Sequence, residues 1–179
     1  MPVQFHPTPL EGVILVTSTA SEDSRGWFQE TYRTSEYRSV GITGFVQDNL
    51  SLSDSGVLRG LHFQRGDHAQ GKLVQVLTGS CWDVAVDLRP DSATWARWWG
   101  VLLTSENRKQ LYLPPGLAHG LLSLTDGTLV SYKCTQEYHP PSEAGIRWDD
   151  PDLAIDWPRK PSLVSEKDAN LPFWKDLWA

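Results

Sequence analysis

Two histidines occur in apolar segments where their side chains could do chemistry. His62 lies inside the run Val57–Gln64, and His119 follows a Pro-Gly turn at the start of another apolar run. A histidine within a strand is most often a structural residue with satisfied hydrogen bonds, and one at the end of a turn often faces solvent. Because the chain has two of them in similar settings, a functional site is the alternative.

Metal ligation is the first chemistry to consider. Metal-binding cupins supply His-x-His followed by a glutamate, whereas this chain reads His62-Phe63-Gln64 and has no acid at the needed spacing. Zinc, iron and manganese sites usually need three or more His, Cys or carboxylate ligands. Cys81 and Cys134 lack a metal-like spacing and are too few for a disulfide framework. We therefore expect no metal site and reduced cysteines.

The segment Thr128–Tyr138 predicts a strand with Tyr132 and Tyr138 on one face, because side chains alternate along a strand. At ~3.3 Å per residue the two tyrosines would lie ~20 Å apart, a span on the scale of an extended nucleotide-sugar. One tyrosine could act on a sugar ring while the other stacks on a base. The alternative is that both are half-buried strand aromatics.

Four basic residues stand in apolar or acidic surroundings: Arg25, Arg59, Lys72 and Lys167. A positive charge in such a place needs a partner. Phosphate oxygens would serve, and so would the carboxylates of Asp83, Asp87 or Glu143. No Gly-x-Gly-x-x-Gly or Walker-type loop occurs, so a diphosphate would have to be held by side chains.

The composition limits the class of protein that can present these residues. The chain has 179 residues, 40% hydrophobic and 21% charged, which is typical of one globular domain, expected over residues 1–179. The formal charge of −6 argues against nucleic acid or an anionic membrane as partner, although a small anionic ligand is allowed. No segment is typical of a signal peptide or approaches the ~20 apolar residues of a membrane span. We expect a cytoplasmic protein.

Short, β-branched apolar runs indicate an all-β fold, either an antiparallel sandwich or a closed barrel. They are Gly12–Thr17, Val57–Phe63, Lys72–Thr78, Cys81–Leu88, Val101–Thr104, Leu111–Leu113 and Thr128–Tyr138. Thr78-Gly79-Ser80 predicts a tight hairpin between two of them. Helix-like windows are limited to Ser35–Val40 and Pro172–Trp178, and from Asp149 onward we expect an irregular tail that covers the sheets.

Short motifs follow one another along nearly the whole chain. They are Asp23–Glu30, Gln47–Asn49, Gly56–Gln64, Lys72–Val74, Asp83–Arg89, Pro114–Gly120, Tyr132, Tyr138, Glu143, Trp148–Pro151 and Ser165–Asp168. In this order and spacing they resemble the dTDP-4-dehydrorhamnose 3,5-epimerase family. The resemblance implies a cupin-like jelly roll, a double-stranded β-helix with a few short helices, that works without a cofactor and forms a homodimer.

The resemblance also implies roles for individual residues. His62 would be the base that removes the proton next to the C4 ketone of the sugar, with Asp168 holding its imidazole. Tyr132 would return a proton from the opposite face, Lys72 would stabilise the enolate oxygen, and Tyr138 would stack on thymine. The remaining substrate contacts would be Arg25, Glu30, Gln47, Asn49, Arg59, His119, Glu143 and Lys167, some of them reaching across the dimer interface.

One spacing needs a structural device. Arg59 and His62 are three positions apart and would face opposite sides of a regular strand, so Gly60 should mark a bulge or bend if both line one pocket.

The function implied by the resemblance is an isomerase that converts dTDP-4-dehydro-6-deoxy-D-glucose to dTDP-4-dehydro-L-rhamnose by inverting C3 and C5, in dTDP-L-rhamnose biosynthesis. One alternative is a C3-only epimerase of the same fold acting on a related dTDP-4-keto-6-deoxysugar. The other is a non-catalytic module that binds nucleotide-sugars, which should have lost His62, Tyr132 or Asp168. All three residues are present.

Overall fold

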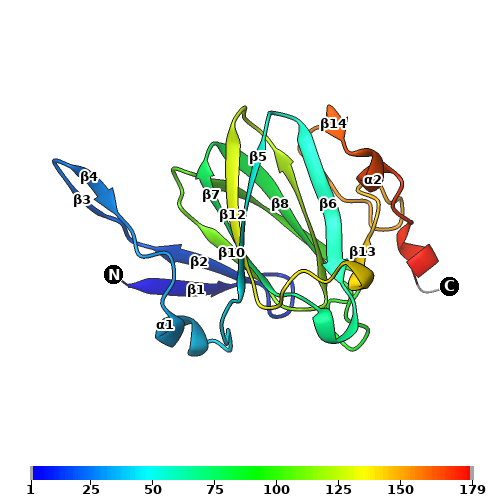
Figure 1. Ribbon diagram of the computed structural model, residues 1–179, viewed down its shortest axis with the longest axis horizontal. Helices are drawn as coiled ribbons and strands as arrows, with labels where there is room; N and C mark the ends of the chain where they lie inside the picture. The colour runs from blue at the N-terminus through cyan, green and yellow to red at the C-terminus, as the bar shows by residue number, and fades with distance from the viewer. Residues whose placement is uncertain (1, 178–179) are drawn as a thin grey trace.

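Two β-sheets enclose the main hydrophobic core in the computed structural model, which describes residues 2–177 (Figure 1). The first sheet has the order β1 (Val3–Pro7), β2 (Ile14–Ser18), β10 (Gln110–Leu113), β7 (Lys72–Thr78), β12 (Thr128–Cys134) and β5 (Gln47–Ser53). The second has the order β13 (Glu143–Gly145), β6 (Val57–Gln64), β11 (Leu117–Ser123), β8 (Ser80–Asp87) and β9 (Trp98–Thr104), and β14 (Leu163–Val164) pairs in parallel with β6. This architecture confirms the predicted double-stranded β-helix.

Alternation along the strands divides the apolar side chains between two sides of each sheet. On β7, Val74 and Val76 enter the core between the sheets, whereas Leu73 packs on the outer side near Tyr37. Burial of each such aliphatic side chain contributes about 1.5–3 kcal/mol. Strand β7 has the same bounds, Lys72–Thr78, as the strand predicted from the sequence.

Strand β8 shows the same division. Cys81 and Ala85 lie in the core between the sheets, while Val84 and Val86 pack on the other side. The residues that cover this outer side come from the C-terminal part of the chain: Ile146, Leu153, Ile155, Trp157, Trp174 and Leu177. The expectation of an irregular tail over the sheets is confirmed.

The predicted hairpin at Thr78-Gly79-Ser80 is wrong. Strands β7 and β8 belong to different sheets and do not pair, so the chain crosses from one sheet to the other at Gly79. Gly79 has φ +77°, and a Cβ there would lie 2.5 Å from Thr125 Oγ1. A glycine marks a sharp reversal in both cases, and only the distant partner strands decide whether it closes a hairpin.

Few helices interrupt the strands. The predicted helix Ser35–Val40 corresponds to α1 (Thr34–Arg38), and Pro172–Trp178 corresponds to the 3₁₀ turn η3 (Trp174–Leu177), although Trp178 lies outside the described residues. Further short elements are η1 (Gly66–His68), η2 (Pro140–Ser142) and α2 (Glu166–Ala169). Figure 1 shows α2 beside β6 and β14.

A bulge interrupts β6 where it pairs with β11. His62 lies opposite His119 and Arg59 lies opposite Leu121, so three steps on β6 match two on β11. Gly60 has φ +116°, and a Cβ there would lie 2.7 Å from the Gly120 Cα, which explains why a glycine is needed. The bulge lets Arg59 and His62 line one cavity, as their spacing predicted.

A two-stranded arm projects from the sheets. It consists of β3 (Ser21–Asp23) and β4 (Gly26–Phe28), and in Figure 1 it extends away from the rest of the molecule as a blue hairpin. Trp27 and Phe28 on this arm are 57% and 70% exposed. The guanidinium of Arg108 lies over the Trp27 ring, with its central carbon 4.4 Å from the ring centroid.

Candidate active site

A cavity of about 430 Å³ lies between the sheets, bordered by β14 and α2. Its polar lining is drawn from strands of both sheets and from α2: Ser51, Arg59, His62, Lys72, His119, Tyr132, Ser165, Lys167 and Asp168. A second cavity of about 230 Å³ shares His62, Lys72 and Tyr132 with the first. It continues toward Gln47, Asn49, Tyr138 and Glu143. The two cavities together bring most of the predicted site residues around one space.

His62 is held in place by Asp168. Its Nε2 lies 2.7 Å from Asp168 Oδ1, and Oδ2 accepts a hydrogen bond from the Gly60 amide at 3.0 Å. Burial would raise the pKa of Asp168, but the hydrogen bonds from His62 and Gly60 hold the pKa below its ordinary value. A carboxylate at Nε2 keeps the proton on that nitrogen and leaves Nδ1 free to accept one.

The short helix α2 positions the carboxylate of Asp168. Ser165 caps the helix, because its Oγ accepts a hydrogen bond from the Asp168 amide at 3.1 Å. The preceding strand β14 pairs with the start of β6, which carries His62 further along. This strand pairing brings Asp168 next to His62, although the two residues are far apart in sequence.

His119 forms a second histidine–carboxylate pair. Its Nε2 lies 2.9 Å from Asp83 Oδ2 and 3.0 Å from Oδ1, and both side chains are buried. Because His119 is directly opposite His62 in the sheet register, the two rings border the same cavity. The sequence had offered Asp83 as a partner for a basic residue, and its partner is instead this histidine.

Lys72 carries an ammonium group with no hydrogen bond or ion pair to any side chain within residues 2–177. Burial lowers its pKa below the ordinary value, and the nearby Cys134, Asp83 and Glu143 partly oppose this. Lys72 is half-buried, and a cation withdrawn from water without a partner is costly. The arrangement therefore favours an anionic or strongly polar ligand group beside Lys72.

Tyr132 faces the same space from β12, opposite Asn49 of β5. Burial raises the pKa of its phenol, and Arg59 nearby lowers it by a smaller amount. The hydroxyl is therefore protonated at neutral pH and can donate a proton.

Arg59 adds a second cationic group at the cavity. Its Nε donates to Ser53 Oγ at 2.9 Å and its Nη2 to the Leu52 carbonyl at 3.1 Å. Within the described part of the chain it pairs with no carboxylate, so its charge is available to a ligand.

Tyr138, Glu143 and Lys167 form a chain of polar contacts at the second cavity. Glu143 accepts from the Tyr138 hydroxyl at 2.8 Å and from Lys167 Nζ at 2.6 Å. Burial would raise the pKa of Glu143, but these two contacts keep it below its ordinary value. The sequence left phosphate or a carboxylate open as the partner of Lys167, and in the described residues Lys167 pairs with the carboxylate of Glu143.

Tyr138 does not lie on the same strand as Tyr132, and that prediction is wrong. Strand β12 ends at Cys134. The Thr135 amide still donates to the Gly71 carbonyl at 2.9 Å, and the next carbonyls, of Gln136 and Glu137, accept from the side chains of Gln70 and Gln64 instead of a strand. Tyr138 therefore follows in an irregular segment, where its ring is 52% exposed.

Arg25 and Glu30 lie outside both cavities. Arg25 pairs with Asp23 on the exposed arm, and Glu30 pairs with Arg33 at 2.8 Å. Their predicted contacts with a substrate cannot be made at the cavities of the same chain.

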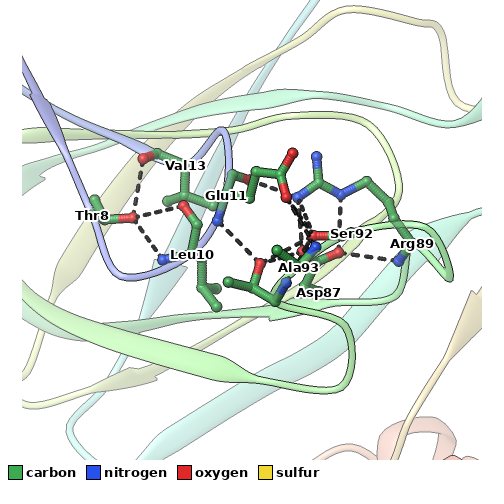
Figure 2. A network of polar contacts seen from close by, with 9 residues as sticks. Thr8, Leu10, Glu11, Val13, Asp87, Arg89, Ser92 and Ala93 are labelled. Atoms are coloured by element: carbon green, nitrogen blue, oxygen red, sulfur yellow. Dashed lines mark hydrogen bonds and ion pairs between the residues drawn. The ribbon is translucent and has the colours of Figure 1, made fainter.

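Asp87 lies outside both cavities, in a separate network of polar contacts (Figure 2). In the sequence it was a possible partner for a basic residue. Its carboxylate accepts from Arg89, Ser92 and Thr94, with Ser92 Oγ at 2.6 Å. Burial would raise its pKa, but these hydrogen bonds lower it to about 2. The network joins the end of β8 to Glu11 between β1 and β2 and serves the fold.

Sequence reasoning missed Ser51 and Ser165 in the lining of the first cavity, and Gln64, Gln70 and Cys134 in that of the second. Ser51 continues the inward face of β5 beyond Gln47 and Asn49, and its buried Oγ has no hydrogen-bond partner among residues 2–177. The period of two along β5 could have identified it. Ser165 begins the motif Ser165–Asp168, and a serine three residues before Asp168 is typical of a helix N-cap.

The described residues provide neither a metal site nor a membrane-spanning helix. No group of three or more His, Cys, Asp or Glu side chains between residues 2 and 177 is arranged to hold a metal ion. Every helix in this range is too short or too polar to cross a bilayer. Cys81 and Cys134 are both free and buried.

The fold and the cavity define a cupin-like jelly roll with an acid–base site, in which an oriented imidazole, a phenol and an unpaired ammonium surround one space. A sequence model of the dTDP-4-dehydrorhamnose 3,5-epimerase family matches residues 7–176, and the chain belongs to this family.

Known proteins support this assignment over the whole chain. The chain is 49% identical to the dTDP-4-dehydrorhamnose 3,5-epimerase of Methanothermobacter thermautotrophicus, covering 97% of this chain and 94% of that protein. A crystal structure of the 3,5-epimerase of Legionella pneumophila in complex with dTDP-4-keto-L-rhamnose has TM-score 0.92 and 43% identity over 96% of this chain and 93% of that one. A 3'-monoepimerase of Streptomyces bikiniensis in complex with dTDP-quinovose has TM-score 0.89 and 34% identity over 94% and 86%.

Proposed function

We propose that the chain converts dTDP-4-dehydro-6-deoxy-D-glucose to dTDP-4-dehydro-L-rhamnose by inverting C3 and C5 of the sugar. The observation that carries this proposal is the meeting of the His62–Asp168 pair, Tyr132 and the unpaired Lys72 at one cavity. The family relatives named above support the substrate class.

His62 removes the proton from the carbon next to the C4 ketone. Asp168 keeps Nε2 protonated, so that Nδ1 is the basic nitrogen, and it stabilises the imidazolium that forms. A proton beside a ketone is a far weaker acid than imidazolium, and each pKa unit of mismatch costs ~1.4 kcal/mol. The base therefore needs help from a group that stabilises the product of proton removal.

Lys72 supplies that help. Its ammonium forms no ion pair with a carboxylate among residues 2–177, so it can stabilise the negative oxygen of the enolate. A donor fixed in a water-poor site contributes ~3–4 kcal/mol to such a transition state. The charge develops on the ketone oxygen during the reaction, which makes Lys72 more effective in the transition state than with the substrate.

Tyr132 returns a proton to the opposite face of the ring. Inversion requires the donor and the base to lie on different faces, and Tyr132 comes from the sheet that faces the one with His62. Because its pKa is raised, the phenol is protonated when the carbanion forms and can donate its proton to that carbon.

The remaining cavity residues bind the rest of the dTDP-sugar. Arg59 and Lys167 contact the diphosphate, and His119 contacts the sugar near His62. Gln47, Asn49, Tyr138 and Glu143 line the second cavity and hold the nucleoside, with the Tyr138 ring stacked on thymine. No metal or other cofactor takes part in these roles.

We also propose a homodimer. Arg25 and Glu30 lie outside the cavities of their own chain, so their substrate contacts are made across a dimer interface. The exposed Trp27 on the arm, and Leu50 and Leu52 on the outer face of the edge strand β5, provide apolar surface for it. Sedimentation of the purified chain as a monomer at micromolar concentration would contradict this.

We also propose the domain organisation of the chain and its cellular location. Residues 1–179 form one domain, supported by the core that both sheets share. The protein acts in the cytoplasm, which fits its two free cysteines.

Identification of the product tests the proposed reaction. The purified chain is incubated with dTDP-4-dehydro-6-deoxy-D-glucose, and the product is identified by NMR. The L-rhamno configuration, with both C3 and C5 inverted, is the expected result. A product inverted at C3 alone would favour the monoepimerase alternative, and unchanged substrate would favour the binding module.

A further inference from the structure

Gln64, the last residue of β6, is a buried amide at the border of the second cavity, and the proposed mechanism gives it no role. Its Nε2 donates to the His68 carbonyl at 2.6 Å and to the Glu137 carbonyl at 3.2 Å. Its Oε1 accepts from the His139 amide at 2.7 Å. A buried amide is unfavourable unless its groups are bonded, and here they are bonded to backbone on two other segments.

Those contacts hold the irregular segment between β12 and β13. The segment carries Tyr138, which lies between the two residues whose backbone groups Gln64 holds, and it ends at Glu143. Glu143 is also the residue opposite Gln64 in the register of β6 and β13. The Gln64 side chain therefore holds the backbone on both sides of Tyr138, and the Gln64 backbone pairs with Glu143. Glu143 in turn accepts the hydrogen bond from the Tyr138 hydroxyl.

Other contacts to the same segment are less protected from water. Gln70 Nε2 donates to the Gln136 carbonyl at 2.7 Å from an exposed position, and Gln47 Oε1 accepts from the Tyr138 amide at 2.7 Å. The rings of His68 and His139 stack at 3.7 Å between centroids, which joins the same two segments that Gln64 joins. Gln64 is the buried centre of this set of contacts.

We propose that Gln64 is a positioning residue for nucleotide binding, which keeps Tyr138 and Glu143 in their binding arrangement before the substrate arrives. This rests on the proposed function, because it takes Tyr138 and Glu143 as contacts of the nucleoside. An irregular segment that must be ordered on binding reduces affinity, and one that is already ordered avoids that cost. Gln64 acts at the nucleotide end, so the chemistry at the sugar is not affected.

The test replaces the amide by a side chain of similar size without hydrogen bonds. Gln64→Met should raise the Kd for dTDP about tenfold, which corresponds to about 1.4 kcal/mol, and leave kcat at saturating substrate within about twofold of wild type. Gln75→Met is the matched control. Gln75 is also buried and bonded to another side chain, Gln110, but it faces the side of β7 away from the cavities. Its substitution should leave the Kd for dTDP unchanged.

A second readout separates positioning from a general loss of structure. In the Tyr138→Ala background, Gln64→Met should weaken dTDP binding no further, because the contact that it positions is already absent. A Gln64→Met variant with wild-type affinity, while Tyr138→Ala binds weakly, would overturn the inference and leave the proposed function intact. Wild-type affinity in Tyr138→Ala would instead contradict the assignment of Tyr138.

Two other results would also count against the positioning role of Gln64. An undiminished effect of Gln64→Met in the Tyr138→Ala background would overturn the inference, and so would a fall in kcat with unchanged Kd. If Gln64→Met does not fold, Gln64→Asn is used instead. It keeps a buried amide but is too short to reach all three backbone partners, so the same rise in Kd is expected.

Discussion

The imidazole of His62 and the carboxylate of Asp168 meet at 2.7 Å although the two residues are 106 positions apart in the chain. The same carboxylate accepts the Gly60 amide, which lies in the bulge that lets Arg59 and His62 share a cavity. The residue that orients the base therefore also fastens the backbone distortion that shapes the site.

Replacing the base should separate chemistry from binding. His62→Asn should abolish exchange of the sugar protons with solvent, because the loss of a general base lowers rates by ~10²–10⁴. The Kd for dTDP should stay near the wild-type value, since His62 acts on the sugar. NMR in deuterated water measures the exchange, and a variant that exchanges at the wild-type rate would remove His62 from the mechanism.

Arg59→Ala should chiefly weaken binding. The guanidinium has no carboxylate partner within residues 2–177, and a charge-assisted contact with diphosphate positions the whole ligand. We expect a rise in the Kd for dTDP of about tenfold or more, from a contribution of about 1.5–3 kcal/mol. Arg147→Ala, which breaks an ion pair with Asp149 outside the cavities, is the control. Unchanged affinity in Arg59→Ala would make Arg59 structural.

Removal of metal ions should not affect turnover. The two histidines of the cavity are each bonded to one carboxylate and lack the further ligands of a catalytic metal site. Prolonged treatment with a chelator, followed by assay of the treated enzyme, checks this. Activity that disappears and returns with zinc, iron or manganese would show that a metal is required.

The buried carboxylate of Asp87 should make stability depend on acid pH. Its folded-state pKa is about 2 against an ordinary 3.8. A lowered pKa stabilises the fold above the unfolded-state value, so this stability is lost as the pH falls from about 4 to about 2. Asp87→Asn should lower the free energy of unfolding at pH 7 by about 1.5–3 kcal/mol and flatten its decline below pH 4. Urea unfolding at a series of pH values measures both, and parallel pH profiles for the two proteins would exclude this role.

Tyr132→Phe should keep proton removal and lose inversion. His62 and Asp168 are unchanged in this variant, so deuterium should still enter from the His62 face. The opposite face then has no phenol to return a proton, and net inversion at C5 should stop. NMR of the recovered sugar reports both quantities. Normal inversion by Tyr132→Phe would assign the proton donor to another group.

Local patterns along the chain predicted much of the fold. The run Lys72–Thr78 became β7 with the same bounds, and the spacing of Arg59 and His62 indicated the bulge at Gly60. These features depend on side-chain alternation and on glycine, both of which can be seen in a few neighbouring residues.

Contacts between residues far apart in the chain explain why some predictions were wrong and why others rested only on the family resemblance. After Cys134 the carbonyls of Gln136 and Glu137 accept hydrogen bonds from the side chains of Gln70 and Gln64, and no pattern within Thr128–Tyr138 contains these partners. The contact of Asp168 with His62 came from the family motif, because no local period connects positions so far apart. The pairing of His119 with Asp83 was missed because adjacent strands place them together only in the folded sheet.

Deuterium incorporation by the wild-type enzyme tests the central claim most directly. The enzyme is incubated with dTDP-4-dehydro-6-deoxy-D-glucose in deuterated water, and label at C3 and at C5 is read separately by NMR. The cavity of His62, Lys72 and Tyr132 predicts label and inversion at both carbons. Label at C3 that never appears at C5 would contradict the account and identify the chain as a C3-only epimerase.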